Sequence, residues 1–165
     1  DEEDVVMLPN LFEDICDIVS ANGWVEYTSP LSVFAVYKLD EVPVNQTLRN
    51  DMKMILTRHP LLNEQLLRKE DDVIRDFRAL GGDFGYFYYE KRFDDEKEAL
   101  VRQQLERELH ELLYDMSIAY VMGGAIGETY TYIDLAIYDK DALMIVLEKL
   151  QEQLSFDIYF KTFIA

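Results

Sequence analysis

The spacing of hydrophobic and polar positions is most informative along residues 119–139, AYVMGGAIGETYTYIDLAIYD. In its second part Ile133, Leu135 and Ile137 recur at every other position, and the residues between them are Asp134 and Ala136. Because successive side chains of a strand point to opposite faces, this spacing predicts a strand that is covered on both sides. We therefore predict a central hairpin. The glycines that a tight return needs lie between its two runs: Gly123, Gly124 and Gly127.

The remainder of the second half alternates between strand and helix patterns. Residues 84–93 have a period of two, and the acids that follow, Asp94, Asp95 and Glu96, predict the start of a long helix. Apolar residues at helical spacing predict its buried stripe: Val101, Leu105, Leu109, Leu112 and Met116. Asp139 or Asp141 is expected to cap a second helix, and residues 156–164 to form a last strand.

The first half is less regular. Helical spacing predicts a helix over residues 11–19, which carries the lone Cys16, and two short strands at residues 24–28 and 31–39. After Pro43 a helix is expected with Asn45 as its cap. Its apolar stripe comprises Leu48, Met52, Ile55 and Leu56. Two shorter helices are expected over residues 61–69 and 71–80.

These elements predict an α+β protein. The order of the second half, β-α-β-β-α-β, resembles the ferredoxin-like architecture, which implies an antiparallel sheet with both helices on one face. An α-β-β-α-α-α segment precedes it and is expected to pack on it. We predict one domain over residues 1–165, with a helical and hairpin half (1–82) and a ferredoxin-like half (83–165). The resemblance concerns architecture alone and implies no function.

The sheet face that points away from those helices is predicted to be aromatic. Asp134 shares this face, and a carboxylate in mid-strand is costly unless paired, so we expect a partner among Lys91, Arg92 and Lys161. Either the first half covers this face or the face binds a ligand. The candidate binding residues are Tyr86, Tyr88, Tyr130, Tyr132, Asp134 and Tyr138.

The charge of the chain restricts its partners. Asp and Glu number 33 against 16 Lys and Arg, a formal net charge of −17. Such a chain repels phosphate backbones and anionic lipid, so we expect neither nucleic acid nor membrane as a partner. Either the acids keep the protein soluble and monomeric through charge repulsion, or they attract a basic protein. The candidate acids for such a partner are Asp94, Asp95 and Glu128.

No catalytic constellation is apparent. The glycine runs at residues 81–85 and 123–127 each favour a turn over a phosphate loop, since neither opens a helix. His59 and His110 offer no zinc spacing, and solvated or capping roles are expected for them. We predict neither enzyme activity nor a metal or cofactor. The lone cysteine favours a cytoplasmic location. Whether a leader peptide was removed is left open, because the chain begins at Asp1.

Two functions are compatible with these observations. The first is a non-catalytic acidic interaction protein, for example a bacterial immunity or inhibitor protein that neutralises a basic toxin or nuclease. The alternative is a regulatory module that binds a small ligand on the aromatic sheet face.

Overall fold

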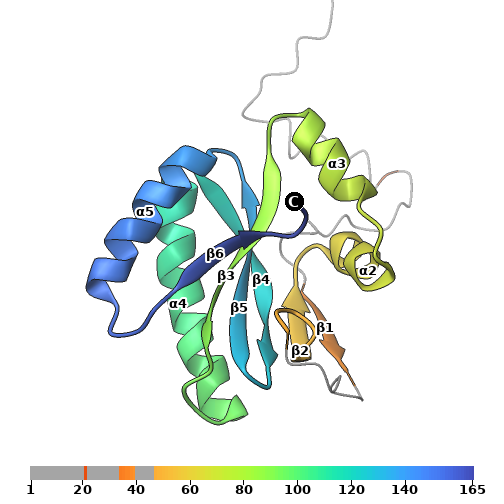
Figure 1. Ribbon diagram of the computed structural model, residues 1–165. Helices are drawn as coiled ribbons and strands as arrows, with labels where there is room; N and C mark the ends of the chain where they lie inside the picture. Colours follow the sequence, from red (N-terminus) through yellow and green to blue (C-terminus); the bar gives the residue numbers. More distant parts are fainter. Residues whose placement is uncertain (1–20, 22–33, 40–46) are drawn as a thin grey trace, which may run out of the picture. The chain divides into compact units, whose positions relative to one another are not determined.

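The computed structural model describes residues 34–39 and 47–165, together with residue 21 (Figure 1). Residues Phe34–Ala165 form one compact unit. The helix predicted at residues 11–19, the strand at 24–28 and the cap at Asn45 lie outside the described residues. The prediction of a single domain over residues 1–165 therefore stays a prediction.

The described residues contain one antiparallel sheet of six strands, in the order β1-β2-β4-β5-β3-β6. Its strands are β1 (Ala35–Lys38), β2 (Met52–Thr57), β3 (Asp83–Glu90), β4 (Ala119–Gly127), β5 (Tyr130–Ile137) and β6 (Tyr159–Thr162). The four strands of the second half are contiguous, and β2 and β1 extend the sheet beyond β4. The β4–β5 hairpin is confirmed, while β3 and β6 are shorter than predicted.

Four helices lie among the described residues, close to the positions predicted. They are α2 (Pro60–Arg68), α3 (Asp72–Ala79), α4 (Asp95–Asp115) and α5 (Lys140–Gln153). Helices α4 and α5 cover one sheet face (Figure 1). The core between them contains Ile133, Leu135 and Ile137, as the alternation predicted. The α+β class with an antiparallel sheet is therefore confirmed.

The opposite sheet face packs against α2 and α3. Leu62 of α2 and Ile74 of α3 form a second apolar cluster with sheet residues Phe84, Tyr120 and Ala136. Each helix is thus held by a buried side chain rather than by its intrinsic helix propensity. Farther along this face, Tyr132 and Tyr86 join Met52 and Ile55 in a third cluster.

The helix predicted around Leu48, Met52, Ile55 and Leu56 is wrong, because β2 occupies Met52–Thr57. The spacing of these four residues fits a helix, but Ile55 and Leu56 are successive strand residues that point to opposite faces. Ile55 is fully buried with Tyr132 on the aromatic face. Because side chains on both faces of β2 are in contact with the fold, the alternation that identifies a half-buried strand is absent.

The glycines of the hairpin were predicted to form its turn, and this prediction is wrong. Gly123, Gly124 and Gly127 lie inside β4, and Glu128 and Thr129 connect it to β5. Gly123 has a φ of +133° at an irregularity in the β4–β5 register. A Cβ at Gly123 would lie 2.1 Å from the carbonyl oxygen of Leu56 in β2. Gly123 and Gly124 therefore allow close approach of neighbouring backbone, and Gly127 leaves room for the Asp51 carboxylate, rather than reversing the chain.

The buried stripe of α4 also differs from the prediction. Leu112 is 44% exposed and Met116 is 59% exposed, whereas Glu98 and Arg102 are buried. The Glu98 carboxylate is satisfied internally: it accepts from the backbone N–H groups of Arg92 and Phe93, both at 3.1 Å. A pattern of apolar positions cannot identify a buried acid of this kind.

Candidate functional site

Asp134 is paired on the aromatic face, but with none of the predicted partners. Its carboxylate accepts two hydrogen bonds from Arg49, at 2.6 and 3.3 Å. The Arg49 guanidinium carbon lies 5.0 Å from the ring centre of Tyr86 and 4.7 Å from that of Phe163. Arg49 therefore closes this part of the face with both an ion pair and cation–π contacts.

Tyr132 belongs to the same network. Its hydroxyl donates to Asp51 at 2.5 Å and accepts from the backbone N–H of Arg49 at 2.9 Å. Burial, and then the hydrogen bond to Asp51, raise the pKa of Tyr132 above its usual range. The second oxygen of Asp51 accepts from the N–H groups of Thr129 and Tyr130, both at 2.9 Å. Tyr132 and Asp134 are thus engaged in internal contacts, at 0% and 6% exposure.

The other predicted tyrosines fall into two groups. Tyr88 lies between Tyr130 and Tyr159, with ring centres 5.8 and 5.3 Å away. These three rings line a hollow of about 460 Å³ at the edge of the sheet. Tyr138 lies apart, after the end of β5, where it is 53% exposed and meets the ring of Phe77. The structure therefore brings five of the six aromatic-face candidates together and leaves Tyr138 outside.

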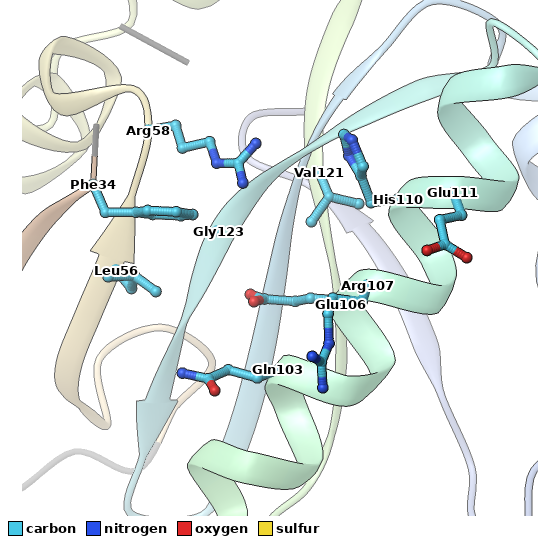
Figure 2. Close-up of a pocket in the computed structure, with 10 residues that line it drawn as sticks. All are labelled: Phe34, Leu56, Arg58, Gln103, Glu106, Arg107, His110, Glu111, Val121 and Gly123. Atoms are coloured by element: carbon cyan, nitrogen blue, oxygen red, sulfur yellow. The ribbon is translucent and has the colours of Figure 1, made fainter. Parts of the chain in front are cut away.

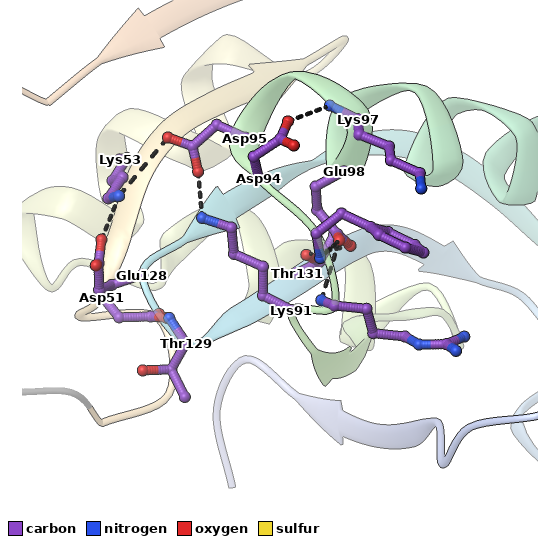
Figure 3. Close-up of polar contacts among 12 residues, drawn as sticks. Asp51, Lys53, Lys91, Asp94, Asp95, Lys97, Glu98, Glu128, Thr129 and Thr131 are labelled. Atoms are coloured by element: carbon purple, nitrogen blue, oxygen red, sulfur yellow. Dashed lines mark hydrogen bonds and ion pairs between the residues drawn. The ribbon is translucent and has the colours of Figure 1, made fainter.

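The three predicted acids have structural roles, Asp94 and Asp95 at the start of α4 and Glu128 in the β4–β5 connection (Figure 3). Asp94 caps the helix by accepting from the N–H of Lys97 at 3.0 Å. Asp95 pairs with Lys91 and with Lys53, and Lys53 also pairs with Glu128. The hydrogen bond from Lys91 is the largest cause that lowers the pKa of Asp95. This acidic cluster is thus largely engaged within the fold.

A cavity that the sequence did not predict lies between α4 and strand β2 (Figure 2). It has a volume of about 390 Å³. We call it the α4 cleft. Its lining residues are Phe34, Leu56, Arg58, Gln103, Glu106, Arg107, His110, Glu111, Val121 and Gly123. Helix α4 packs against β4 and β5, and the cleft forms where β2 extends the sheet past β4.

The wall on the β2 side carries an arginine. Arg58 donates to the Tyr120 hydroxyl at 2.5 Å, and its guanidinium carbon lies 4.4 Å from the ring centre of Phe34. Its Nε is buried and has no hydrogen-bond partner among the described residues. Arg58 thus presents a cation next to apolar side chains.

The opposite wall is one face of α4. Glu106 and Arg107 each lie three or four residues from both Gln103 and His110, so the four residues lie along the same side of the helix. Glu106 pairs with the buried Arg102, and burial is the largest cause that raises its pKa.

His110 is not solvated as predicted. Its ring stacks on Tyr114 and meets Tyr120 edge-on at 5.1 Å. The buried Nδ1 of His110 has no hydrogen-bond partner among the described residues. His59, by contrast, has a capping role: its Nδ1 accepts from the N–H of Leu62 at 3.1 Å, and burial lowers its pKa.

The α4 cleft left only a weak signal in the sequence. The polar residues of α4 at helical spacing form a second stripe beside the apolar one, but a solvated helix face gives the same pattern. Arg58 follows a segment that was predicted to be helical, so its position beside this stripe could not be anticipated.

The described residues contain no cluster of three or more His, Cys, Asp or Glu side chains suited to a metal ion. None of the helices in the described part of the chain is long and apolar enough to cross a membrane. Comparison of the chain with models of protein families, with curated proteins and with solved structures found no match.

Proposed function

We propose that this chain is a non-catalytic interaction protein whose acidic surface binds a basic protein, for example as a bacterial immunity or inhibitor protein that neutralises a toxin or nuclease. The observation that carries the proposal is the outer surface of α5. Ile145 is 55% exposed there, and Asp141 and Glu148 lie four and three residues from it. Lys149, four residues after Ile145, is the one base that the described residues of α5 place on this side of the helix. Exposed apolar residues among unpaired acids suit a partner that combines positive charge with apolar contact.

The acids of α5 are better placed for this role than the acids at the start of α4. Glu148 and Glu152 are exposed, and neither forms an ion pair within the described residues. Residues 1–33 add eight Asp and Glu and contain neither Lys nor Arg. A negative field of this size speeds association with a basic partner and weakens as salt increases.

The proposal is tested in two steps. Tagged protein is first used to capture partners from the source cell at low and high salt, and the retained proteins are identified by mass spectrometry. The captured partner is then purified and its association rate with the variant E148Q/E152Q is measured. We expect a rate about threefold to tenfold below that of the unmodified chain at low salt, with little difference at high salt.

The matched control is E64Q/E70Q, which removes the same charge from exposed positions on and just after α2. It is expected to slow association less than E148Q/E152Q. An association rate that does not respond to salt would contradict the electrostatic proposal. Equal effects of the two variants would contradict the placement of the partner on α5.

The alternative function, binding of a small ligand on the aromatic face, is supported by the hollow beside Tyr88, Tyr130 and Tyr159. Tyr132 and Asp134 contribute little to it, because their polar atoms already have partners. The hollow is lined by two carboxylates, Glu90 and Asp157, and by the cationic Arg92, next to aromatic rings. A polar aromatic molecule is the ligand that this surface suits.

We also propose that residues 83–165 form a ferredoxin-like unit. The support is the run β6-β3-β5-β4 within the sheet, in which the first and third strands of the unit are adjacent at its centre. Strands β2 and β1 would then be an extension on the β4 edge. An experimental structure with another strand order would contradict this assignment.

A further inference from the structure

Arg58 differs from the other part-buried arginines of this protein. Arg49 is paired with Asp134, and Arg78 is paired with Asp83 at 2.9 and 3.1 Å. Arg58 has the Tyr120 hydroxyl as its hydrogen-bond partner, and no carboxylate among the described residues lies within ion-pair distance of it. Among the described residues of this acidic chain, a part-buried cation with no carboxylate within ion-pair distance requires an explanation.

The surroundings of Arg58 provide an explanation for this part-buried cation. Phe34, Leu56 and Val121 line the α4 cleft as apolar walls next to the guanidinium group. Figure 2 shows the Arg58 side chain extending from the β2 side toward the space above Glu106. Arginine presents a planar fork of N–H donors that matches a carboxylate. Small-molecule sites typically combine apolar walls with a few such polar groups, in cavities of about 300–1,000 Å³.

The acids of the cleft limit the charge of a ligand. Glu106 and Glu111 both line the cleft; Glu106 is paired with Arg102, and the charge of Arg58 also acts against the rise in its pKa that burial causes. A second negative group on the ligand would approach these carboxylates and be repelled. The side chains of Gln103 and His110 offer hydrogen bonds to a neutral polar group.

We propose that the α4 cleft binds a small organic monocarboxylate with an apolar body, whose carboxylate pairs with Arg58 and whose body packs on Phe34, Leu56 and Val121. This site is separate from the acidic surface of α5 and does not depend on a protein partner. It is also separate from the hollow beside Tyr88, which lies at the other edge of the sheet.

The test uses phenylacetate as the probe and its neutral amide, phenylacetamide, as the matched comparison. Both are titrated into the full chain while backbone and side-chain NMR signals are recorded. We expect phenylacetate to shift signals of residues 103–111, 121–123 and Arg58, and to bind at least about tenfold more tightly than the amide. Inorganic phosphate alone is expected to bind more weakly than phenylacetate, since it lacks the apolar body.

Three variants locate the interaction. Arg58→Met should weaken phenylacetate binding about tenfold or more and leave the amide unchanged, and Arg58→Lys should have an intermediate effect because it keeps the charge but loses the fork. Arg75→Met, at an exposed position on α3, is the control and should not alter binding. Since the mapping uses the unmodified chain, the proposal is tested even if Arg58→Met does not fold.

Four results would overturn the proposal. They are equal binding of acid and amide, equal binding by Arg58→Met and the unmodified chain, absence of any shift at saturating probe, and shifts confined to Tyr88, Tyr130 and Tyr159. The last result would place the ligand in the hollow on the aromatic face instead.

Discussion

The ion pair between Arg49 and Asp134 holds distant parts of the chain together. The two residues are 85 positions apart, and their side chains are 14% and 9% exposed. Removing one member leaves an almost buried charge without its partner. We therefore expect Asp134→Ala to lower the free energy of unfolding by about 3 kcal/mol. Urea unfolding of the variant and of the unmodified chain would measure this loss.

A matched control is Asp76→Ala on the exposed side of α3, which should change the free energy of unfolding by less than about 0.5 kcal/mol. In the double variant R49M/D134A the loss should be smaller than the sum of the two single losses, because neither charge is then left alone. A loss for Asp134→Ala no larger than that of the control would contradict a stabilising role of the pair.

The need for a partner at Asp134 could be predicted from the sequence, but the partner could not. A carboxylate in the middle of an apolar strand is conspicuous in any sequence. The choice among the lysines and arginines depends on which backbone segments meet, and Arg49 lies in a stretch that was predicted to be helical. Arg49 itself has a φ of +65°, which marks it as a turn residue that a helical pattern cannot reveal.

At the level of elements, Gly123 is the position on which the attachment of β2 to β4 depends. Its φ of +133° is unfavourable for a residue with a Cβ, and that Cβ would lie 2.1 Å from the Leu56 carbonyl oxygen. We expect Gly123→Ala to lower the free energy of unfolding by about 3 kcal/mol, since strain and the clash act together. Hydrogen exchange should also show faster exchange at the Arg58 N–H, which donates to Met122.

Gly81→Ala is the matched control for this prediction. Gly81 has a φ of +91°, but a Cβ there would meet no atom within 4 Å. Only the backbone strain applies, so its cost should be about 1 kcal/mol. Equal costs at the two glycines, measured by the same urea unfolding, would mean that the close approach of β2 to β4 is not what Gly123 provides.

Elements with one dominant period of apolar residues could be predicted, and so could β5, whose β-branched and aromatic residues indicate a strand covered on both faces. Helices α2 and α3, the long α4 and the capped α5 all follow from apolar spacing and end signals. Strand β2 did not, because its apolar residues serve both faces. The glycine-rich part of β4 was misinterpreted for a related reason: glycine permits a turn and a close strand contact equally.

For the molecule as a whole, the total charge could be read from the sequence but its distribution could not. Asp51, Glu98 and Asp134 are buried at 0%, 0% and 6% exposure and make internal hydrogen bonds. Asp94 and Asp95, which were predicted to face a partner, also cap α4 and pair with Lys91 within the fold. The acidic surface available to a basic protein is therefore smaller than the net charge of −17 implies. On the described helices it consists mainly of acids that make no internal hydrogen bond or ion pair.

Buried tyrosines make stability depend on pH in the alkaline range. Burial is the largest cause that raises the pKa values of Tyr86, Tyr89 and Tyr132. A group whose pKa is raised by folding stays protonated in the folded chain while the unfolded chain loses its proton near pH ~10. The stabilisation is therefore complete below about pH 10 and is lost as the pH rises further.

Tyr89 allows this dependence to be separated from hydrogen bonding. It is 0% exposed, and its hydroxyl makes no hydrogen bond of normal geometry among the described residues, although the Glu98 carboxylate lies close enough to add to the rise in its pKa that burial causes. Tyr89→Phe should leave stability at neutral pH unchanged or raise it by about 1 kcal/mol, because an unpaired buried hydroxyl is removed. It should also make the loss of stability above about pH 10 less steep, since one titrating group is gone.

Tyr132→Phe provides the contrast, because it removes the hydrogen bonds to Asp51 and from Arg49 and should destabilise the chain at neutral pH. Thermal unfolding of both variants at neutral pH and at about pH 10.5 gives the comparison. If Tyr89→Phe is destabilised at neutral pH as much as Tyr132→Phe, the Tyr89 hydroxyl has a partner in solution. If the alkaline slope is unchanged in Tyr89→Phe, Tyr89 does not contribute to the loss of stability at high pH.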